Sequence, residues 1–201
     1  MYMSKMQGSG NIYQNVIAVT NRHLCSRPLT EQVERICRCH PKAVILREKD
    51  LTEEAYTDLA GEIITICRNY EIPCILHTFV NAAKTLNCSA IHLPLPLLRE
   101  YAAVPDLLSC FTTVGTSVHS ADDALEAVRL GASYVTAGHI YTTDCKKGIP
   151  PRGLEFLRKI CQIISLPVYA IGGIKADEHQ LSEVIHCGAK GGCIMSGMME
   201  V

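Results

Sequence analysis

The feature that most constrains the fold is a regular alternation of short apolar runs with longer amphipathic stretches. Eight apolar runs predict strands, and they lie at 16–20, 43–46, 72–76, 90–93, 113–117, 134–137, 167–171 and 191–195. The stretches between them have helical spacing, except where prolines at 94, 96 and 105 leave room only for short helical pieces within 97–109. Strands that are apolar on both faces are typical of a parallel sheet covered by helices.

Eight such repeats in 201 residues predict an α/β fold, a TIM (β/α)8 barrel with parallel strands. An open doubly wound sheet is the alternative, but no G-x-G-x-x-G follows the first run. We expect a flexible N-terminal lead-in over 1–14, which is polar with scattered glycine and serine, and a single barrel domain over 15–201. Only four residues follow Gly197, so the last helix is expected to be missing or very short, and a homodimer would cover that side.

The composition excludes several classes of protein. Apolar residues make up 48% and charged residues 19%, which is typical of a globular chain. A formal net charge of −1 gives no bulk attraction to nucleic acid or to an anionic membrane. No apolar run approaches the ~20 residues that span a bilayer, and the N-terminus lacks the apolar middle of a signal peptide. We therefore expect a cytoplasmic protein without a nucleic-acid or membrane partner.

Cysteine is frequent, but its pattern does not predict a metal site or a disulfide framework. The 11 cysteines are odd in number and form no C-x-x-C motif. Cys37 and Cys39 precede His40, yet a second pair of ligands at finger spacing is missing. Several cysteines lie inside apolar runs, where a free thiol packs as a small apolar group. We expect reduced thiols in the core.

One helix is predicted in more detail. Ser120 is followed by two aspartates, a typical helix start, and Gly131 is a typical stop. Its inward face is expected to hold Ala124, Leu125, Ala127 and Val128.

In such a barrel the active site lies at the C-terminal ends of the strands. This rule selects polar and small residues that follow the eight runs. They are Thr20, Arg47, Lys49, His77, His92, Ser117, His119, His139, Thr143, Lys146, Gly172, Gly173, Ser196 and Gly197.

Two glycine-bearing loops follow the seventh and eighth runs, where barrels of this kind usually bind phosphate. Gly172 and Gly173 lie in one loop, and Ser196 and Gly197 in the other. Without side chains, their backbone N–H groups can approach phosphate oxygens. The alternative is that these glycines only make tight turns.

Cationic residues follow the second and sixth runs. Arg47 and Lys49 alternate with Glu48, so both should point to one side, where they could bind a carboxylate or pyrophosphate or form a solvated charged turn. In the loop over 137–148, His139 can act as a proton shuttle near neutral pH, beside Thr143 and Lys146. Asp144 is the only obvious carboxylate at this mouth, so a metal site is poorly supported.

Five motifs carry a resemblance to a known family. They are V-I-A-V-T-N at 16–21, L-R-E-K-D at 46–50, G-T-S-V-H-S at 115–120, A-I-G-G-I at 170–174 and I-M-S-G at 194–197. Together they resemble the thiamine-phosphate synthase superfamily in order and spacing over nearly the whole chain. The resemblance implies a TIM barrel.

The superfamily has two main branches. Synthases join a pyrimidine pyrophosphate to a thiazole phosphate with Mg²⁺, and usually carry N-D-R-x-D after strand three and an aspartate after strand four. This chain has H-T-F-V-N at 77–81 and L-P-L-P at 93–96 instead, and Ile45 where a glutamine is usual. The loop G-H-I-Y-T-T-D-C-K-K-G at 138–148 is more similar to that of TenI-type thiazole tautomerases, whose catalytic histidine falls on His139.

The resemblance implies an isomerase of thiamine biosynthesis that aromatises a thiazole-carboxylate phosphate without a cofactor. His139 would move the proton, the loops with Gly172, Gly173, Ser196 and Gly197 would bind the phosphate, and Arg47 or Lys146 the carboxylate. Lys49, Ser117 and Thr143 would complete the binding site for this thiazole phosphate. One alternative is a thiamine-phosphate synthase, which would need Mg²⁺, and another is a non-catalytic regulator that binds thiamine-pathway phosphates.

Overall fold

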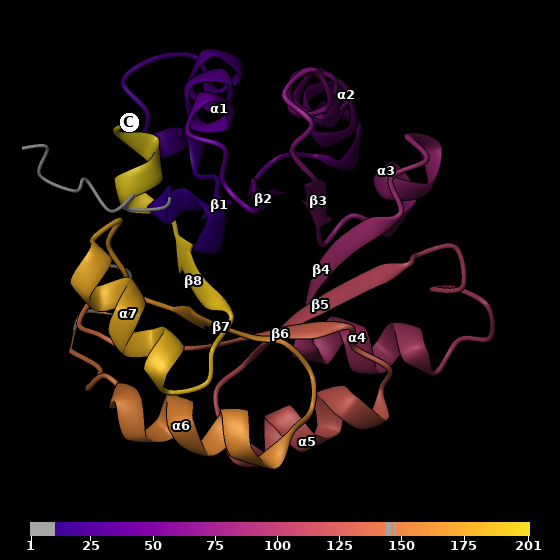
Figure 1. The fold of residues 1–201 in the computed structure, drawn as a ribbon. Coiled ribbons are helices and arrows are strands. Elements are labelled where there is room, and N and C mark those ends of the chain that lie inside the picture. Colours follow the sequence, from indigo (N-terminus) through magenta and orange to yellow (C-terminus); the bar gives the residue numbers. More distant parts are fainter. Residues whose placement is uncertain (1–10, 144–145, 147) are drawn as a thin grey trace, which may run out of the picture.

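The chain folds into a closed barrel of eight parallel strands (Figure 1). The computed structural model describes residues 11–143, 146 and 148–201. The strands are β1 Val16–Val19, β2 Ala43–Leu46, β3 Cys74–His77, β4 Ala90–Pro94, β5 Thr113–Val118, β6 Tyr134–Gly138, β7 Val168–Ile171 and β8 Gly191–Ile194. Each strand pairs in parallel with its neighbours in the sequence, and β1 also pairs with β8. The predicted barrel is confirmed, and each strand boundary lies within two residues of its predicted position.

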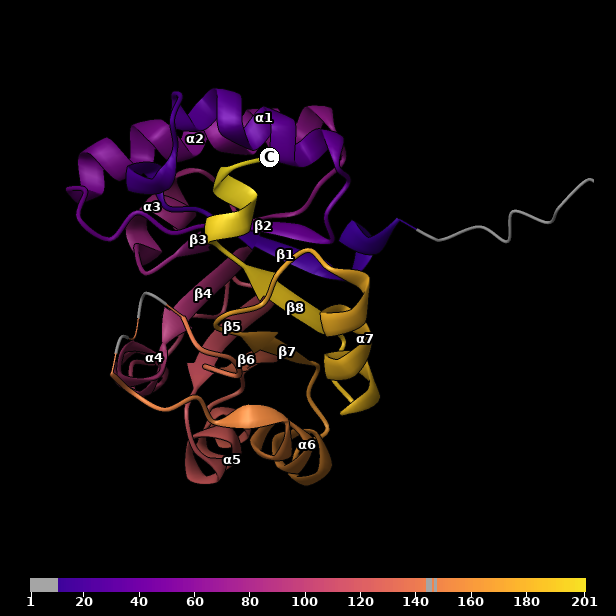
Figure 2. The same cartoon turned by 90° about the vertical axis from the view of Figure 1, so that its left-hand side faces the viewer.

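In the described part of the chain, seven α-helices cover the outside of the barrel (Figures 1 and 2). They are α1 Leu29–Arg38, α2 Glu53–Asn69, α3 Val80–Thr85, α4 Leu95–Ala102, α5 Ala121–Arg129, α6 Gly153–Ile163 and α7 Glu178–His186. After β8 the chain forms only a 3-10 helix over Ser196–Met199, in agreement with a very short last helix. This 3-10 helix lies beside α1 in Figure 2. The side-chain amide of Gln32 in α1 donates a hydrogen bond to the Met198 carbonyl at 2.8 Å.

The core has two parts, which the alternation along each strand separates. Ile17 and Val19 of β1 point into the barrel, whereas Val16 and Ala18 pack against the helices. The barrel interior is filled by a small set of buried side chains. They are Ile17, Val19, Ala43, Ile45, Ile75, Tyr134, Tyr169 and Cys193.

The predicted start of α5 is confirmed, but the inward face of this helix is narrower than predicted. Ser120 Oγ accepts a hydrogen bond from the Asp123 amide at 3.0 Å. Ala124 and Ala127 are fully buried, whereas Leu125 and Val128 are 41% and 40% exposed. Placing the last two on the inward face was wrong, because the small Ala124 and Ala127 side chains alone form the contact stripe.

The proline-rich region contains one short helix, as predicted, but it begins two residues before the predicted range. The helix α4 begins at Leu95 and has Pro96 in its first turn. A proline in the first turn removes only an N–H group that has no partner within the helix. Pro96 therefore fits the start of α4 instead of breaking the region into pieces.

The predicted N-terminal lead-in is only partly within the described residues. Residues 1–10 lie outside them, and Ile12–Asn15 forms a 3-10 helix. The Asn11 side-chain amide donates to the Cys39 carbonyl at 2.8 Å, and Ile12 and Tyr13 pack against the core. The part packed on the barrel thus begins before residue 15.

None of the helices in the described part of the chain is long and apolar enough to cross a bilayer. The ten described cysteines are free thiols, while Cys145 lies outside the described residues.

Candidate active site

A cavity of about 530 Å³ opens at the C-terminal ends of the strands. Every strand or the loop that follows it contributes to the lining. Of the ten residues that the family resemblance assigns to the site, nine line this one cavity, namely Arg47, Lys49, Ser117, His139, Thr143, Lys146, Gly172, Gly173 and Ser196. Gly197 is exposed and does not line it. The barrel rule therefore finds a common cavity, and the roles of these residues remain predictions.

The two cations after β2 point into the cavity because Glu48 points the other way. Glu48 is buried and accepts a hydrogen bond from the Thr20 hydroxyl at 2.7 Å. It also accepts from the Arg22 amide and the Arg22 guanidinium, each at 3.1 Å. Thr20 Oγ1 in turn accepts from the Arg47 amide at 2.9 Å. This buried carboxylate therefore holds the loop after β1 against the loop after β2 and leaves Arg47 and Lys49 on the cavity side.

The cations around the mouth differ in their partners. Desolvation lowers the pKa of Lys49, and the nearby charge of Arg47 lowers it further. Arg99 also lines the cavity, but its guanidinium pairs with the Glu126 carboxylate at 2.7 and 2.8 Å. Arg47 and Lys49 therefore concentrate positive charge at the β2 side of the mouth, whereas the charge of Arg99 is paired with that of Glu126.

The floor of the cavity holds two buried imidazoles. The rings of His77 and His92 stack with their centroids 5.5 Å apart. Burial is the main cause that lowers the pKa of His77 to about 2 and that of His92 to about 3. The neighbouring His92 lowers the pKa of His77 further, and the charges of Lys49 and Arg47 lower both. Both rings are therefore neutral near pH 7, and the Thr78 hydroxyl lies 2.6 Å from Nδ1 of His77.

Tyr134 closes the barrel beneath these rings. Its ring lies so close to Gly115 that a Cβ atom there would be 2.1 Å from the Tyr134 Cζ atom. Only glycine leaves room for the tyrosine at this level of β5. The Tyr134 hydroxyl lies 3.0 Å from His92 Nδ1, and His92 Nε2 lies 2.9 Å from Ser117 Oγ.

The loop after β6 is tied to β7 and α6 by backbone hydrogen bonds. The Ile140 amide donates to the Ile171 carbonyl and the Tyr141 amide to the Gly172 carbonyl, both at 2.9 Å. The Arg152 amide donates to the His139 carbonyl at 2.9 Å. This part of the loop is therefore held as an extension of the barrel rather than as a free surface segment.

The two glycines after β7 have a packing role that the sequence did not reveal. Gly172 and Gly173 have φ values of +91° and +72°. A Cβ atom on Gly172 would lie 2.2 Å from the Cβ atom of His139, and one on Gly173 would lie 2.5 Å from the Thr142 carbonyl oxygen. The loop after β6 therefore packs directly on these glycines, whatever they bind in the cavity.

His139 forms part of the cavity wall and is only 4% exposed. Its Nε2 atom lies 3.3 Å from the Ile149 carbonyl oxygen. A carbonyl can only accept, so Nε2 carries the proton of the neutral ring and Nδ1 keeps a lone pair. Nδ1 is buried and has no hydrogen-bond partner among the residues that the structure describes. The cavity wall therefore contains an imidazole whose unused acceptor atom is itself closed to solvent.

Thr143 and Lys146 line the same side of the cavity as His139. The Lys146 amide donates to the Thr143 carbonyl at 3.1 Å. Asp144, the carboxylate noted in the sequence, lies outside the described residues.

The lining does not fit a Mg²⁺ ion well, judged by its donor atoms. Within the described chain, Asp123 is the only carboxylate that lines the cavity, and it accepts a hydrogen bond from the His119 amide at 2.7 Å. The described residues contain no cluster of three acidic, histidine or cysteine side chains suited to a metal. Mg²⁺ prefers carboxylate and phosphate oxygens, whereas this lining is rich in cations and imidazoles.

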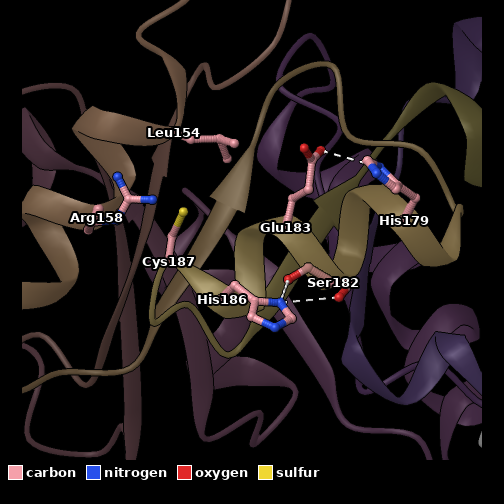
Figure 3. A pocket seen from close by; sticks show the side chains of 7 residues that line it. All are labelled: Leu154, Arg158, His179, Ser182, Glu183, His186 and Cys187. Atoms are coloured by element: carbon pink, nitrogen blue, oxygen red, sulfur yellow. Dashed lines mark hydrogen bonds and ion pairs between the residues drawn. The ribbon is translucent and has the colours of Figure 1, made fainter.

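A second pocket, of about 370 Å³, lies on the outer surface between α6 and α7 (Figure 3). Its lining residues are Leu154, Arg158, His179, Ser182, Glu183, His186 and Cys187. The His186 ring turns back onto its own helix, with Nδ1 2.7 Å from the Ser182 carbonyl oxygen. Glu183 accepts a hydrogen bond from the Tyr141 hydroxyl at 2.9 Å. These polar groups already have partners on α7 or in Tyr141, so the barrel mouth is the stronger candidate.

Sequence reasoning overlooked three supporting residues. Tyr134 was assigned only to a strand, although it carries the hydroxyl beneath His92. Asp123 and Arg99 line the cavity from α5 and α4, outside the strand ends that the barrel rule selects. Among these three residues, only Tyr134 had a signal in the sequence: it lies on β6 in register with Gly115 of β5, and a glycine leaves room for a large neighbour.

The fold and the site together define a (β/α)8 barrel with a cationic, histidine-rich mouth. The sequence model of the family described as "Thiamine monophosphate synthase" matches residues 16–198. The chain therefore belongs to this family of thiamine biosynthesis.

Relatives of known name agree with this membership. The chain is 31% identical to the thiamine-phosphate synthase of Clostridium acetobutylicum, over 94% of this chain and 89% of that protein. It is 30% identical to the thiamine-phosphate synthase of Syntrophomonas wolfei, over 90% and 86%. Among solved structures, the thiamine phosphate pyrophosphorylase from Pyrococcus furiosus matches with a TM-score of 0.78 and 27% identity, over 95% of this chain and 90% of that one. These named relatives are synthases, not tautomerases.

Proposed function

We propose that the chain is a thiazole tautomerase, an isomerase that aromatises a thiazole-carboxylate phosphate by a proton shift through His139. The observation that carries the proposal is the state of His139. His139 lies in the cavity wall with its Nε2 proton directed at the Ile149 carbonyl, and its buried Nδ1 lone pair has no partner among the described residues. An imidazole in this state is a base that can take a proton from a ring carbon and return it elsewhere.

The charges around the mouth support the same reaction. Arg47, Lys49 and Lys146 line the cavity and suit a ligand with anionic groups. A cation beside the carboxylate stabilises the negative charge that develops when the ring carbon loses its proton. The proton then moves to a second carbon of the same conjugated system, so no atom or electron is gained or lost.

The phosphate end suits the loops after β7 and β8. Gly173 and Ser196 line the cavity, and their amide N–H groups donate to no other backbone group in the described residues. Backbone amides at this position of a barrel are a common phosphate site. Gly197 is adjacent to this site but outside the lining.

Thiamine-phosphate synthase is the second candidate, and the names of the relatives favour it. Such an enzyme would use the same cations for a pyrophosphate group. Against it stands the donor set, because the only carboxylate in the described lining already binds a backbone amide.

The test is an absorbance assay of the purified protein with the unaromatised thiazole phosphate. We expect His139→Ala and His139→Gln to lower kcat by about 10²-fold or more, since both remove the proton carrier. Gln can still donate to the Ile149 carbonyl, so it separates proton transfer from support of the loop. His186→Gln, on the exposed face of α7, is the matched control and should keep full activity.

A rate no faster than that in buffer would reject the tautomerase. Thiamine phosphate formed from pyrimidine pyrophosphate, thiazole phosphate and Mg²⁺ would then support the synthase. Tight binding of the thiazole phosphate without turnover in either assay would indicate a non-catalytic regulator.

A further inference from the structure

Four polar side chains form a continuous hydrogen-bonded chain from the barrel interior to the cavity wall. The Tyr134 hydroxyl lies 3.0 Å from His92 Nδ1, and His92 Nε2 lies 2.9 Å from Ser117 Oγ. Ser117 Oγ lies 3.0 Å from Thr136 Oγ1. Ser117 and Thr136 line the cavity, whereas Tyr134 does not.

Counting protons shows that this chain holds one more donor than it can use internally. Each of the three hydroxyl groups carries one proton, and a neutral imidazole carries one N–H. The chain has three hydrogen bonds, so one of its four protons must go elsewhere. His92 is neutral because burial holds its pKa at about 3.

The surplus proton belongs at the cavity end. Tyr134 is 6% exposed, and among the described residues His92 is the only hydrogen-bond partner of its hydroxyl. If the chain ran the other way, the tyrosine proton would be buried without an acceptor, which is strongly unfavourable. Tyr134 therefore donates to Nδ1, and Nε2–H of His92 donates to Ser117.

We propose that Tyr134 and His92 are positioning residues that hold the Ser117–Thr136 hydroxyl pair as a hydrogen-bond donor to an acceptor atom of the bound ligand. Since Ser117 accepts from His92, either Ser117 or Thr136 directs its remaining proton into the cavity. Both hydroxyl groups sit in one register pair of β5 and β6.

The depth of this donor indicates which part of the ligand it meets, a step that rests on the proposed function. Thr136 is in register with Tyr169, three residues before Gly172 on β7. Three residues of strand span about 10 Å. A phosphate at the loop after β7 would therefore leave the donor facing the ring or carboxylate end, which carries the acceptor atoms.

The first experiment needs no ligand. In the folded protein labelled with ¹⁵N, NMR should show His92 as the tautomer with a proton on Nε2 and none on Nδ1. Tyr134→Phe removes the donor that fixes this state and should populate the other tautomer. Tyr169→Phe is the matched control, because Tyr169 is also 6% exposed inside the barrel and packs edge-on against Tyr134. A proton on Nδ1 in the unaltered protein would overturn the proposal.

The second experiment measures binding of the aromatic thiazole-carboxylate phosphate by calorimetry. Ser117→Ala should weaken binding about ten- to hundredfold, as expected for loss of a hydrogen bond to a charged group, and Tyr134→Phe should weaken it less. Neither change should affect binding of inorganic phosphate. Equal affinities of Tyr134→Phe and Tyr169→Phe for the thiazole compound would contradict the positioning role.

The two proposals can fail separately. If the protein has no tautomerase activity, the His92 tautomer still tests the direction of the chain. If activity is present and the tautomer is reversed, only the positioning role is lost. Urea unfolding of each variant shows whether a weaker affinity comes from a damaged fold.

Discussion

The floor and the rim of the cavity differ in charge: the floor holds neutral buried rings, and the rim holds cations. On the floor, His77, His92 and Tyr134 are buried, and the two imidazoles stay neutral. On the rim, Arg47 and Lys49 carry charge at the open end of the same cavity. Burial is the main cause of the neutral state of the floor, and the cations of the rim add to it, whereas the rim depends on neighbours that direct its side chains. A ligand with anionic ends and an uncharged ring matches this division.

The rim itself has two kinds of support. On the β2 side, one buried carboxylate, Glu48, joins two loops through side-chain hydrogen bonds. On the β6 and β7 side, His139 is held by backbone hydrogen bonds and by contact with Gly172. The first support can be broken by removing a charge and the second by adding a methyl group.

The largest effect is expected from acid, which should lower the free energy of unfolding through the two histidines of the floor. The folded-state pKa values of His77 and His92 lie near 2 and 3, below the ordinary value of about 6.5. The unfolded chain therefore binds more protons in the window from pH 6.5 down to about 3, and stability falls as the pH falls. Between pH 6.5 and 4.5 we expect the pair to lower the free energy of unfolding by about 5 kcal/mol, measured by urea titration.

Two variants sharpen this prediction. His77→Gln should remove about half of the pH dependence, while His186→Gln on exposed α7 should leave it unchanged. If His77→Gln and the unaltered protein lose stability in parallel, the floor histidines do not control the acid response.

Much of this architecture could be predicted from the sequence, because it depends on local patterns. The eight apolar runs fix the strands, and Ser120 fixes the start of α5 through a bond to a residue three positions away. The barrel rule then locates the cavity. The cation pair also follows from local geometry, since the alternation in a strand separates Arg47 and Lys49 from Glu48.

The rest depends on contacts between residues far apart in the chain. The sequence predicts Gly172 as part of a phosphate site, and only the folded barrel reveals its contact with His139. The burial of Tyr134 against Gly115 and the pairing of Thr20 with Glu48 are equally long-range. Such contacts produce no repeating pattern in the sequence from which they could be predicted.

The next largest effect is expected from a methyl group on the β7 side of the rim. Gly172→Ala would put a Cβ atom 2.2 Å from the Cβ atom of His139, at a φ of +91°. We expect a loss of about 3 kcal/mol or more in the free energy of unfolding, together with displacement of His139 and loss of activity.

Gly131→Ala is the matched control for that variant. Gly131 also has a positive φ, +80°, but a Cβ atom there would meet nothing within 4 Å. It should lose only about 1 kcal/mol, the cost of the backbone conformation alone. Similar losses in the two variants would mean that the contact with His139 does not restrict the loop.

The smallest effect is expected on the β2 side of the rim, where Glu48→Gln keeps the shape of the side chain and removes its charge. An amide in place of one carboxylate oxygen would oppose the donors of Arg22 and Thr20, so we expect a loss of about 2 kcal/mol. Asp50→Asn is the control, because Asp50 binds the same Arg22 guanidinium but its side chain is 52% exposed, against 1% for Glu48. It should lose less than about 1 kcal/mol.

Urea unfolding measures the stability of both variants, and titration with inorganic phosphate tests whether Arg47 and Lys49 still face the cavity. Weaker phosphate binding in Glu48→Gln alone would tie the aim of the cations to this carboxylate. Unchanged binding would mean that the strand alternation of β2 is enough to direct them, and that Glu48 contributes to stability only.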